Sequence, residues 1–253
     1  MHRPDLVVAL ARDMIEASQP MSCRRASEVL GPSRDTIWRW RLAIIGALPP
    51  EPDGTLAGIV EADEAHQRES RKGSREWVLH KPDPVNHPAP PRLRWRVYRR
   101  RGGSATAPPG GWRAWEKKLL AATDRAGQRT FETIADAGQT PISGALLPVM
   151  APDAVLCTDG FATYERIAKD ERIPHNALNG RRRSKRTPRS HHINTVNALI
   201  GRFRAFMQPL CGPASKNLAA YGRWHAARHD ADRSYLDVLR LLFDSGPRIN
   251  TVC

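Results

Sequence analysis

Cysteine is scarce in the sequence, and long apolar runs are absent from it. Only four cysteines occur among 253 residues, and no two of them form a C-x-x-C pair. A disulfide framework and a zinc ribbon are therefore not expected. No apolar run approaches the roughly 18–20 residues that cross a bilayer, and charges at Arg12, Asp13 and Glu16 interrupt the first apolar stretch. We expect a soluble, cytoplasmic protein without a membrane partner.

Two common catalytic motifs are also missing. The G-x-x-x-x-G-K-[ST] loop that holds ATP phosphates does not occur, and neither does the G-x-S-x-G nucleophile elbow of hydrolases.

Lysine is scarce as well, since it supplies only seven of the 40 basic residues. Against 26 acidic residues the net charge is +14, and it is carried mostly by arginine. The planar arginine fork suits phosphate, so the excess charge indicates a nucleic-acid partner.

Residues 6–48 have the pattern of three short helices. Apolar residues three and four positions apart mark the first, while Ser22 and Ser33 are suited to cap the second and third. Gly31-Pro32 interrupts the chain before the third helix, whose outer face is basic, so the pattern is typical of a helix-turn-helix; a helical hairpin packed on the main domain is the alternative. The expected DNA contacts are Ser33, Arg34, Thr36, Trp38, Arg39 and Arg41.

The composition changes after residue 50. Pro49–Gly54 has the composition of a linker, so we expect a DNA-binding domain at 1–50 and a second domain at 55–245. Within the second domain, 66–116 is a basic insertion rich in proline and arginine, interpreted as a partly disordered loop or as a segment ordered on nucleic acid. Its expected DNA contacts are Arg94, Arg96, Arg99, Arg100 and Arg101.

The second domain alternates between strand and helix patterns, which predicts an α/β fold with a mixed sheet flanked by helices. A strand is expected at Ile59-Val60, ending in Glu61–Glu64. A hairpin follows, then helix, strand, helix and strand patterns in turn, then a basic run and three more helix patterns. The expected ranges are 117–124, 129–135, 140–150, 154–157, 161–170, 173–178, 192–208, 214–229 and 234–243, and the basic run offers Arg181, Arg182, Arg183, Lys185 and Arg186 to DNA.

Two aspartates are expected just after short apolar strands. Asp63 follows Ile59-Val60, and Asp159 follows the wholly apolar run Val155–Cys157. In open α/β sheets ligands bind at the carboxyl ends of strands. Paired carboxylates there provide the oxygen ligands and the negative charge that divalent cations need. Taken singly, an aspartate after a strand is more often a turn former, but together in a basic protein they favour metal-dependent phosphodiester chemistry.

The order of the motifs resembles a bacterial insertion-sequence transposase, more narrowly the fifteen-ninety-five family of insertion sequences. The resemblance rests on the helix-turn-helix pattern, Val60–Glu64, Thr158-Asp159-Gly160 and His192–Asn197. The segments 68–73 and 213–218 are also similar to the family, so the likeness covers about 6–240. Members commonly begin with a zinc ribbon, which this sequence lacks.

The resemblance implies a ribonuclease H-like catalytic domain with a DDE-type site whose third acid is replaced by asparagine. Asp63, Asp159 and Asn197 then match the three metal-binding catalytic positions, and Arg204 matches the basic position where the family usually has lysine. Residues 197 and 204 are seven apart, so a helix presents both on one face. The implied cofactor is Mg²⁺, with Mn²⁺ able to substitute. The implied partner is double-stranded DNA, bound at the bacterial nucleoid by a homo-oligomer.

Other interpretations remain open at this stage. The chain could be an inactive remnant that regulates by binding DNA, or a nuclease of the same fold that cleaves without joining. His191-His192 could supply a ligand in place of Asn197. His225 and His229, four apart beside Asp230, have a spacing that zinc sites use, but no third ligand with supporting context follows.

Overall fold

The computed structural model describes residues 3–49, 55–70, 72–87, 116–178, 190–229 and 233–245. Strands and helices alternate through these residues, which confirms the expected α/β class with a mixed sheet flanked by helices. None of the helices in the described ranges is long and apolar enough to cross a membrane.

Three helices, a strand and a short helix come first, followed by the hairpin and the alternating elements. They are α1 (Pro4–Glu16), α2 (Cys23–Leu30), α3 (Arg34–Gly46), β1 (Ile59–Arg68), α4 (Glu76–Leu79), β2 (Glu116–Thr123), β3 (Arg129–Ile134), α5 (Gln139–Leu146), η3 (Leu147–Val149), β4 (Val155–Thr158), α6 (Ala162–Asp170) and β5 (His175–Ala177). The C-terminal helices are α7 (Asn194–Met207), η4 (Gln208–Leu210), η5 (Ser215–Asn217), α8 (Leu218–Ala227) and α9 (Tyr235–Ser245).

The five strands form one sheet in the order β3-β2-β1-β4-β5. β1 pairs antiparallel with β2 and parallel with β4, so it is the strand at which the sheet changes from antiparallel to parallel. β1 is longer than predicted: it continues through Arg68 because residues 61–68 pair with β2 along their whole length. Asp63 therefore lies inside the strand and not after it, which corrects the expected position.

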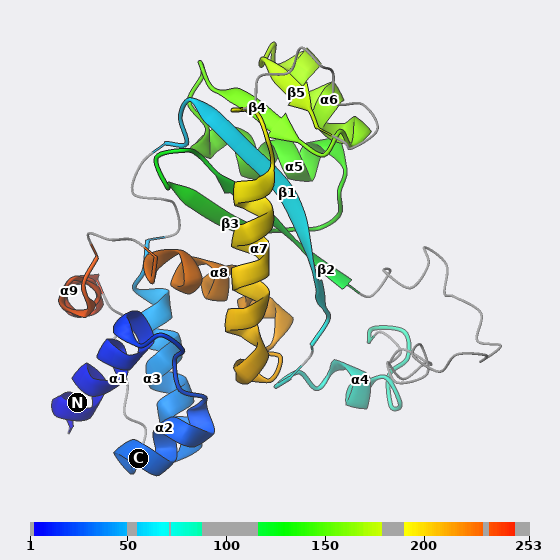
Figure 1. Ribbon diagram of the computed structural model, residues 1–253. Helices are drawn as coiled ribbons and strands as arrows, with labels where there is room; N and C mark the ends of the chain where they lie inside the picture. Colours follow the sequence, from blue (N-terminus) through cyan, green and yellow to red (C-terminus); the bar gives the residue numbers. More distant parts are fainter. Residues whose placement is uncertain are drawn as a thin grey trace, which may run out of the picture.

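Side chains alternate between the two faces of the sheet, and each face has its own core. Val60, Ala62 and Leu120 pack under α5 and α6, whereas Ala65 and Ala121 lie on the opposite face with residues of α7 and α8. Figure 1 shows α7 lying across this second face beside α8. The face that carries Asp63 is therefore the face covered by α7.

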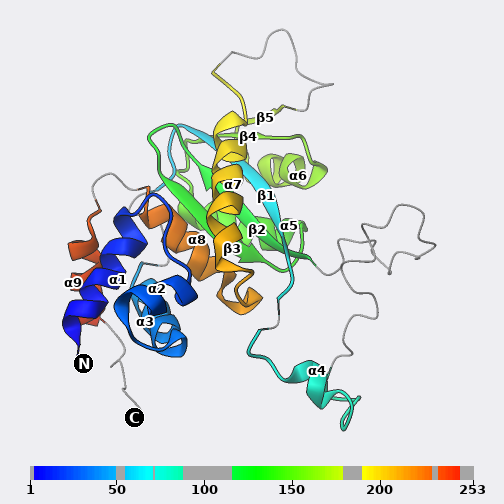
Figure 2. The same ribbon diagram turned by 60° about the horizontal axis from the view of Figure 1, so that its bottom comes forward.

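The N-terminal helices join the second of these cores. Val7, Met14 and Ile37 belong to the same hydrophobic cluster as Phe203 of α7, so this core continues across the expected domain boundary near residue 50. Polar contacts join the same parts, since the indole Nε1 of Trp224 donates to the Met14 carbonyl at 2.8 Å. Figure 2 shows α1, α2 and α3 gathered beside α8 and α9.

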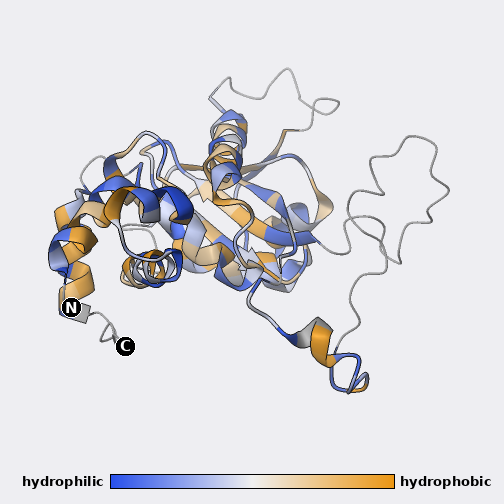
Figure 3. Ribbon diagram, turned by 90° about the horizontal axis from the view of Figure 1, so that it is seen from below, coloured by the Kyte–Doolittle hydropathy of each residue, from blue (hydrophilic) through white to orange (hydrophobic). Residues whose placement is uncertain are grey.

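The predicted insertion at 66–116 begins with the end of β1 and ends with the start of β2. Between them, α4 stands apart from the body of the protein, and its hydrophobic turn is visible in Figure 3. Val78 and Leu79 of this helix are exposed. Residues 88–115, with the five predicted arginine contacts, lie outside the described residues.

Candidate active site

Asp63 and Asp159 are brought together by the register of two parallel strands. Glu61 of β1 pairs with Cys157 of β4, and the same offset places Asp63 opposite Asp159, one residue beyond the end of β4. Asp63 is half-buried and Asp159 is exposed. Each carboxylate also accepts one nearby backbone amide, from Glu64 at 2.7 Å and from Phe161 at 2.9 Å. The predicted pair is therefore adjacent at the edge where β4 ends and β1 continues.

The pKa of Asp63 reports the electrostatics of this edge. Burial raises it above its ordinary value, and the charge of Asp159 raises it further. The amide of Glu64 and the guanidinium of Arg204 act in the opposite direction. Arg204 on α7 is thus close enough to Asp63 to stabilise its ionised form. The structure brings three of the four predicted catalytic residues into one electrostatic group.

Asn197 lies on the same α7 but is less closely tied to the carboxylates. Val196, Leu199 and Phe203 form the buried face of the helix, and both Asn197 and Arg204 are exposed. Their spacing of seven puts them two turns apart on one face, as expected. Among the described residues no hydrogen bond joins the Asn197 amide to either aspartate. Its role as a third ligand stays a prediction.

The carboxylate oxygens of Asp63 and Asp159 are donors of the kind that a hard divalent cation binds. Two carboxylates held next to each other repel, and the raised pKa of Asp63 shows part of that cost. A bound cation would remove the cost, and oxygen donors are what Mg²⁺ prefers. Within the described ranges no group of three or more His, Cys, Asp or Glu side chains is arranged to hold a metal ion. The fit to Mg²⁺ therefore rests on the chemistry of the two carboxylates.

Glu64 and Tyr164 were not predicted as part of this region. Burial raises the pKa of Glu64, the Tyr164 hydroxyl lowers it, and the charges of Asp63 and Asp159 raise it. Burial also raises the pKa of Tyr164 well above its ordinary value. The acid after Asp63 in the sequence was a visible signal, but the neighbouring tyrosine comes from α6 and could not be identified without the fold.

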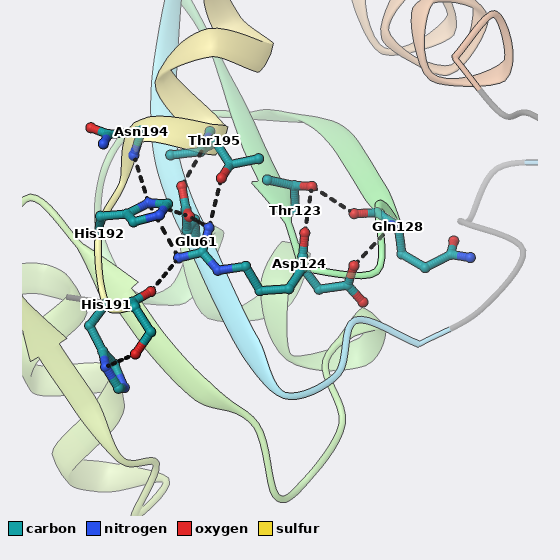
Figure 4. A network of polar contacts seen from close by, with 11 residues as sticks. Glu61, Thr123, Asp124, Gln128, His191, His192, Asn194 and Thr195 are labelled. Atoms are coloured by element: carbon teal, nitrogen blue, oxygen red, sulfur yellow. Dashed lines mark hydrogen bonds and ion pairs between the residues drawn. The ribbon is translucent and has the colours of Figure 1, made fainter. Parts of the chain in front are cut away.

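A second unpredicted acid, Glu61, forms a buried polar network beside the site (Figure 4). Its side chain is 1% exposed. Arg125 of the β2–β3 turn donates to its Oε1, and the backbone amide of Val196 donates to its Oε2 at 2.9 Å. Nδ1 of His192 lies 3.1 Å from Oε1. His192, weighed as an alternative metal ligand, is therefore engaged with Glu61.

Helix α3 presents most of the predicted DNA contacts to solvent. Ser33 caps the helix by accepting the amide of Thr36 at 3.2 Å. Arg34, Trp38 and Arg39 are exposed, with Arg39 paired to Asp35 on the next turn back. This face is free of the protein core and available to a partner.

The prediction for Arg41 is wrong. Its side chain is 1% exposed, donates to the Met21 carbonyl at 2.5 Å and lies over the ring of Trp224 at 5.2 Å. The physical reason is helical geometry, because Arg41 follows Ile37 by four residues and so shares its buried face. Arg41 joins α3 to α8 and is not available to DNA.

The basic run at 181–186 lies outside the described residues, as do the arginines at 94–101. Their predicted contacts with DNA stay predictions. The structure describes the two histidines weighed for zinc, which lie at the end of α8 and directly after it. His225 is buried with its ring edge-on to Phe131, and burial lowers its pKa to about 3. His229 has a lowered pKa through burial and nearby arginines. Positive surroundings of this kind oppose a zinc ion.

A scan of the chain against protein-family models gave no match, and a search of curated proteins found no similar sequence. The site therefore stands on its own geometry: two adjacent carboxylates, a nearby arginine, and a helix that covers one face of a mixed sheet.

Proposed function

We propose that the chain is a DDE-type transposase, which cuts DNA at the ends of an insertion sequence and joins the freed ends to a target. The observation that carries the proposal is the position of Asp63, on β1, beside Asp159, directly after the neighbouring parallel strand β4, with the charge of Arg204 acting on Asp63. The mixed sheet flanked by helices is compatible with the ribonuclease H-like layout that the sequence resemblance implies.

The residues divide the chemistry among them. Asp63, Asp159 and the amide oxygen of Asn197 would hold Mg²⁺ or Mn²⁺, which supplies Lewis-acid activation of a phosphodiester. Arg204 would bind a non-bridging phosphate oxygen and keep the phosphate in line for attack. Water attacks first and releases a 3′-hydroxyl; this hydroxyl then attacks a target phosphodiester, so that one bond forms for each bond broken.

DNA binding is assigned to two kinds of surface. The exposed face of α3, with Arg34, Trp38 and Arg39, would contact the ends of the element, as a recognition helix does in the major groove. The net charge of +14 provides sequence-independent attraction to phosphates. Cutting and joining two ends needs two active sites, so a homo-oligomer on DNA is part of the proposal.

The test is an oligonucleotide duplex that carries the inverted repeats flanking the gene, incubated with the protein and Mg²⁺ or Mn²⁺. Wild-type protein should cleave and join. Asp63→Asn and Asp159→Asn should do neither, while they bind DNA nearly as tightly, because affinity comes from phosphate contacts spread over the surface. Glu171→Gln, which removes one exposed carboxylate at the end of α6, is the matched control and should keep full activity.

Each alternative has its own result in this assay. A nuclease of the same fold would cleave without joining. A remnant that only regulates would bind the repeats and do neither in either metal. Near-normal cleavage by an aspartate variant would remove that residue from the site.

A further inference from the structure

The buried side chain of Glu61 makes polar contacts with two distant parts of the chain, which the pairing of its own strand does not require. It lies two residues before Asp63, so both side chains are on the α7 face of β1. Both of its oxygens are engaged, Oε1 by Arg125 and Oε2 by the amide of Val196. Burial of a carboxylate is costly unless such partners are present. The carboxylate is therefore built into the joint between β1 and α7.

Glu61 acts as the N-cap of α7 from a distant strand. The residue at the usual cap position is Ile193, whose apolar side chain makes no cap hydrogen bond. Glu61 accepts the amide of Val196, the third residue of the helix, which a local cap would ordinarily accept. A negative charge at this end is also favoured by the helix dipole.

Arg125 fixes the same joint from the hairpin. It donates to Thr195 at 2.7 Å and to the Ser190 carbonyl at 2.8 Å, in addition to Glu61. The turn that carries Arg125 is itself held, because buried Asp124 accepts the Gln128 amide at 2.9 Å and the Ala57 amide at 3.1 Å. Figure 4 shows Glu61 between His192 and Thr195 at the first turn of α7, with Asp124 and Gln128 in the nearby turn.

We infer that Glu61 and Arg125 are positioning residues, which hold the first turn of α7 in place so that Asn197 and Arg204 face Asp63. The inference rests on the proposed function. Val196 precedes Asn197 directly, so the tie is one residue away from a candidate ligand. Replacing a buried ion pair by apolar residues is often neutral for stability, so its use beside the site favours a role in orientation. A displacement of about 1 Å at a reacting centre can cost roughly 100-fold in rate.

Three variants test the joint in the full-length protein. Glu61→Gln keeps the size of the side chain but removes the charge and one acceptor oxygen, so that either Arg125 or the Val196 amide faces an NH2 donor. Arg125→Met removes the guanidinium, and Thr195→Val removes only one acceptor of Arg125 and keeps the shape of the threonine. The matched controls are Glu171→Gln and Arg166→Ala, which remove exposed charges from α6.

The first measurement is hydrogen exchange of the protein alone, without DNA or metal. In Glu61→Gln and Arg125→Met, peptides covering 190–200 should exchange about tenfold faster, while peptides of α5 stay unchanged. Thr195→Val should give a smaller change in the same peptides. Faster exchange across the whole sheet would overturn the inference, because it would mean a general structural role. Unchanged exchange at 190–200 would also overturn it.

The second measurement is strand cleavage at saturating DNA. The positioning role predicts a rate about 100-fold lower in Glu61→Gln and Arg125→Met, with unchanged DNA affinity and an unchanged Mg²⁺ concentration for half-maximal rate. A raised Mg²⁺ requirement with normal exchange would make Glu61 a metal ligand instead. If wild-type protein cleaves nothing, the proposed function fails, whereas the exchange measurement still decides whether the joint exists.

Discussion

Arg39 and Arg41 lie two positions apart in α3 and so point to different faces of the helix, and they should behave as two different kinds of residue. Arg39 is exposed and pairs with Asp35, whereas Arg41 is buried between α3 and α8. We expect Arg39→Met to weaken DNA binding without affecting folding. We expect Arg41→Met to destabilise the fold without a direct effect on DNA binding. The pair is a matched test, since both changes remove one guanidinium from the same helix.

The cost of Arg41→Met follows from its contacts. The change removes a charge-assisted hydrogen bond to the Met21 carbonyl, worth about 1.5–3 kcal/mol, and a cation–π contact with Trp224, worth about 1–2 kcal/mol. Part of this loss is offset, because the guanidinium Nε is buried with no hydrogen-bond partner within the described ranges. Methionine removes the free-energy cost of desolvating that group. The net loss in the free energy of unfolding is about 2–3 kcal/mol, which lowers Tm by roughly 4–12 °C in a chain of this size.

The cost of Arg39→Met is electrostatic. Its exposed ion pair within the helix contributes about 0.3–0.5 kcal/mol, so Tm should move by no more than about 2 °C. Loss of one phosphate contact should reduce the slope of log K against log salt by roughly 0.9.

Calorimetry gives Tm. Fluorescence anisotropy of a labelled duplex at several salt concentrations, measured at a temperature below the Tm of both variants, gives the slope. A buried, structural Arg41 is contradicted if Arg41→Met reduces the salt slope by about 0.9 and leaves Tm unchanged. Such a result would mean that Arg41 leaves the core to reach DNA.

Three further predictions concern stability. Gly222→Ala should lower the free energy of unfolding, measured with urea, by about 1–3 kcal/mol, because the new Cβ would lie 2.4 Å from Cβ of Phe131. Gly144→Ala is the matched control: nothing lies within 4 Å of its new Cβ, so the same free energy should rise by about 0.4–1 kcal/mol. Asp63→Asn should raise Tm at neutral pH without metal, because a carboxyl with a raised pKa lowers the stability of the folded state once it ionises. Near pH 3 the variant should have no higher Tm than the wild type. Equal Tm values of the two proteins at pH 7 would contradict this prediction. Burial lowers the pKa of His225 to about 3. The free energy of unfolding should therefore fall as pH drops below about 6.5, because the unfolded chain then binds a proton at this histidine and the folded protein does not. His225→Leu should show a shallower fall between about pH 6.5 and 4.

Local sequence signals determined the order and type of most elements. Serines at 22 and 33 begin α2 and α3 at the predicted residues, because a cap hydrogen bond is made within three positions of the chain. The hairpin of β2 and β3 and the apolar strand β4 were likewise predicted, since periodicity and turn residues act over short distances. The two aspartates could be chosen for the same reason: each lies in a recognisable local context.

The tertiary structure decided what depends on partners far along the chain. β1 continues to Arg68 through polar residues because β2, about 50 positions later, supplies its hydrogen bonds. Arg41 is buried because α8 brings Trp224 against it. Glu61 likewise depends on a distant partner, the amide of Val196, 135 positions away. A side chain's charge can be read from the sequence, but its burial and its partner are set only when separate elements meet, because desolvation and hydrogen bonding depend on distance in space.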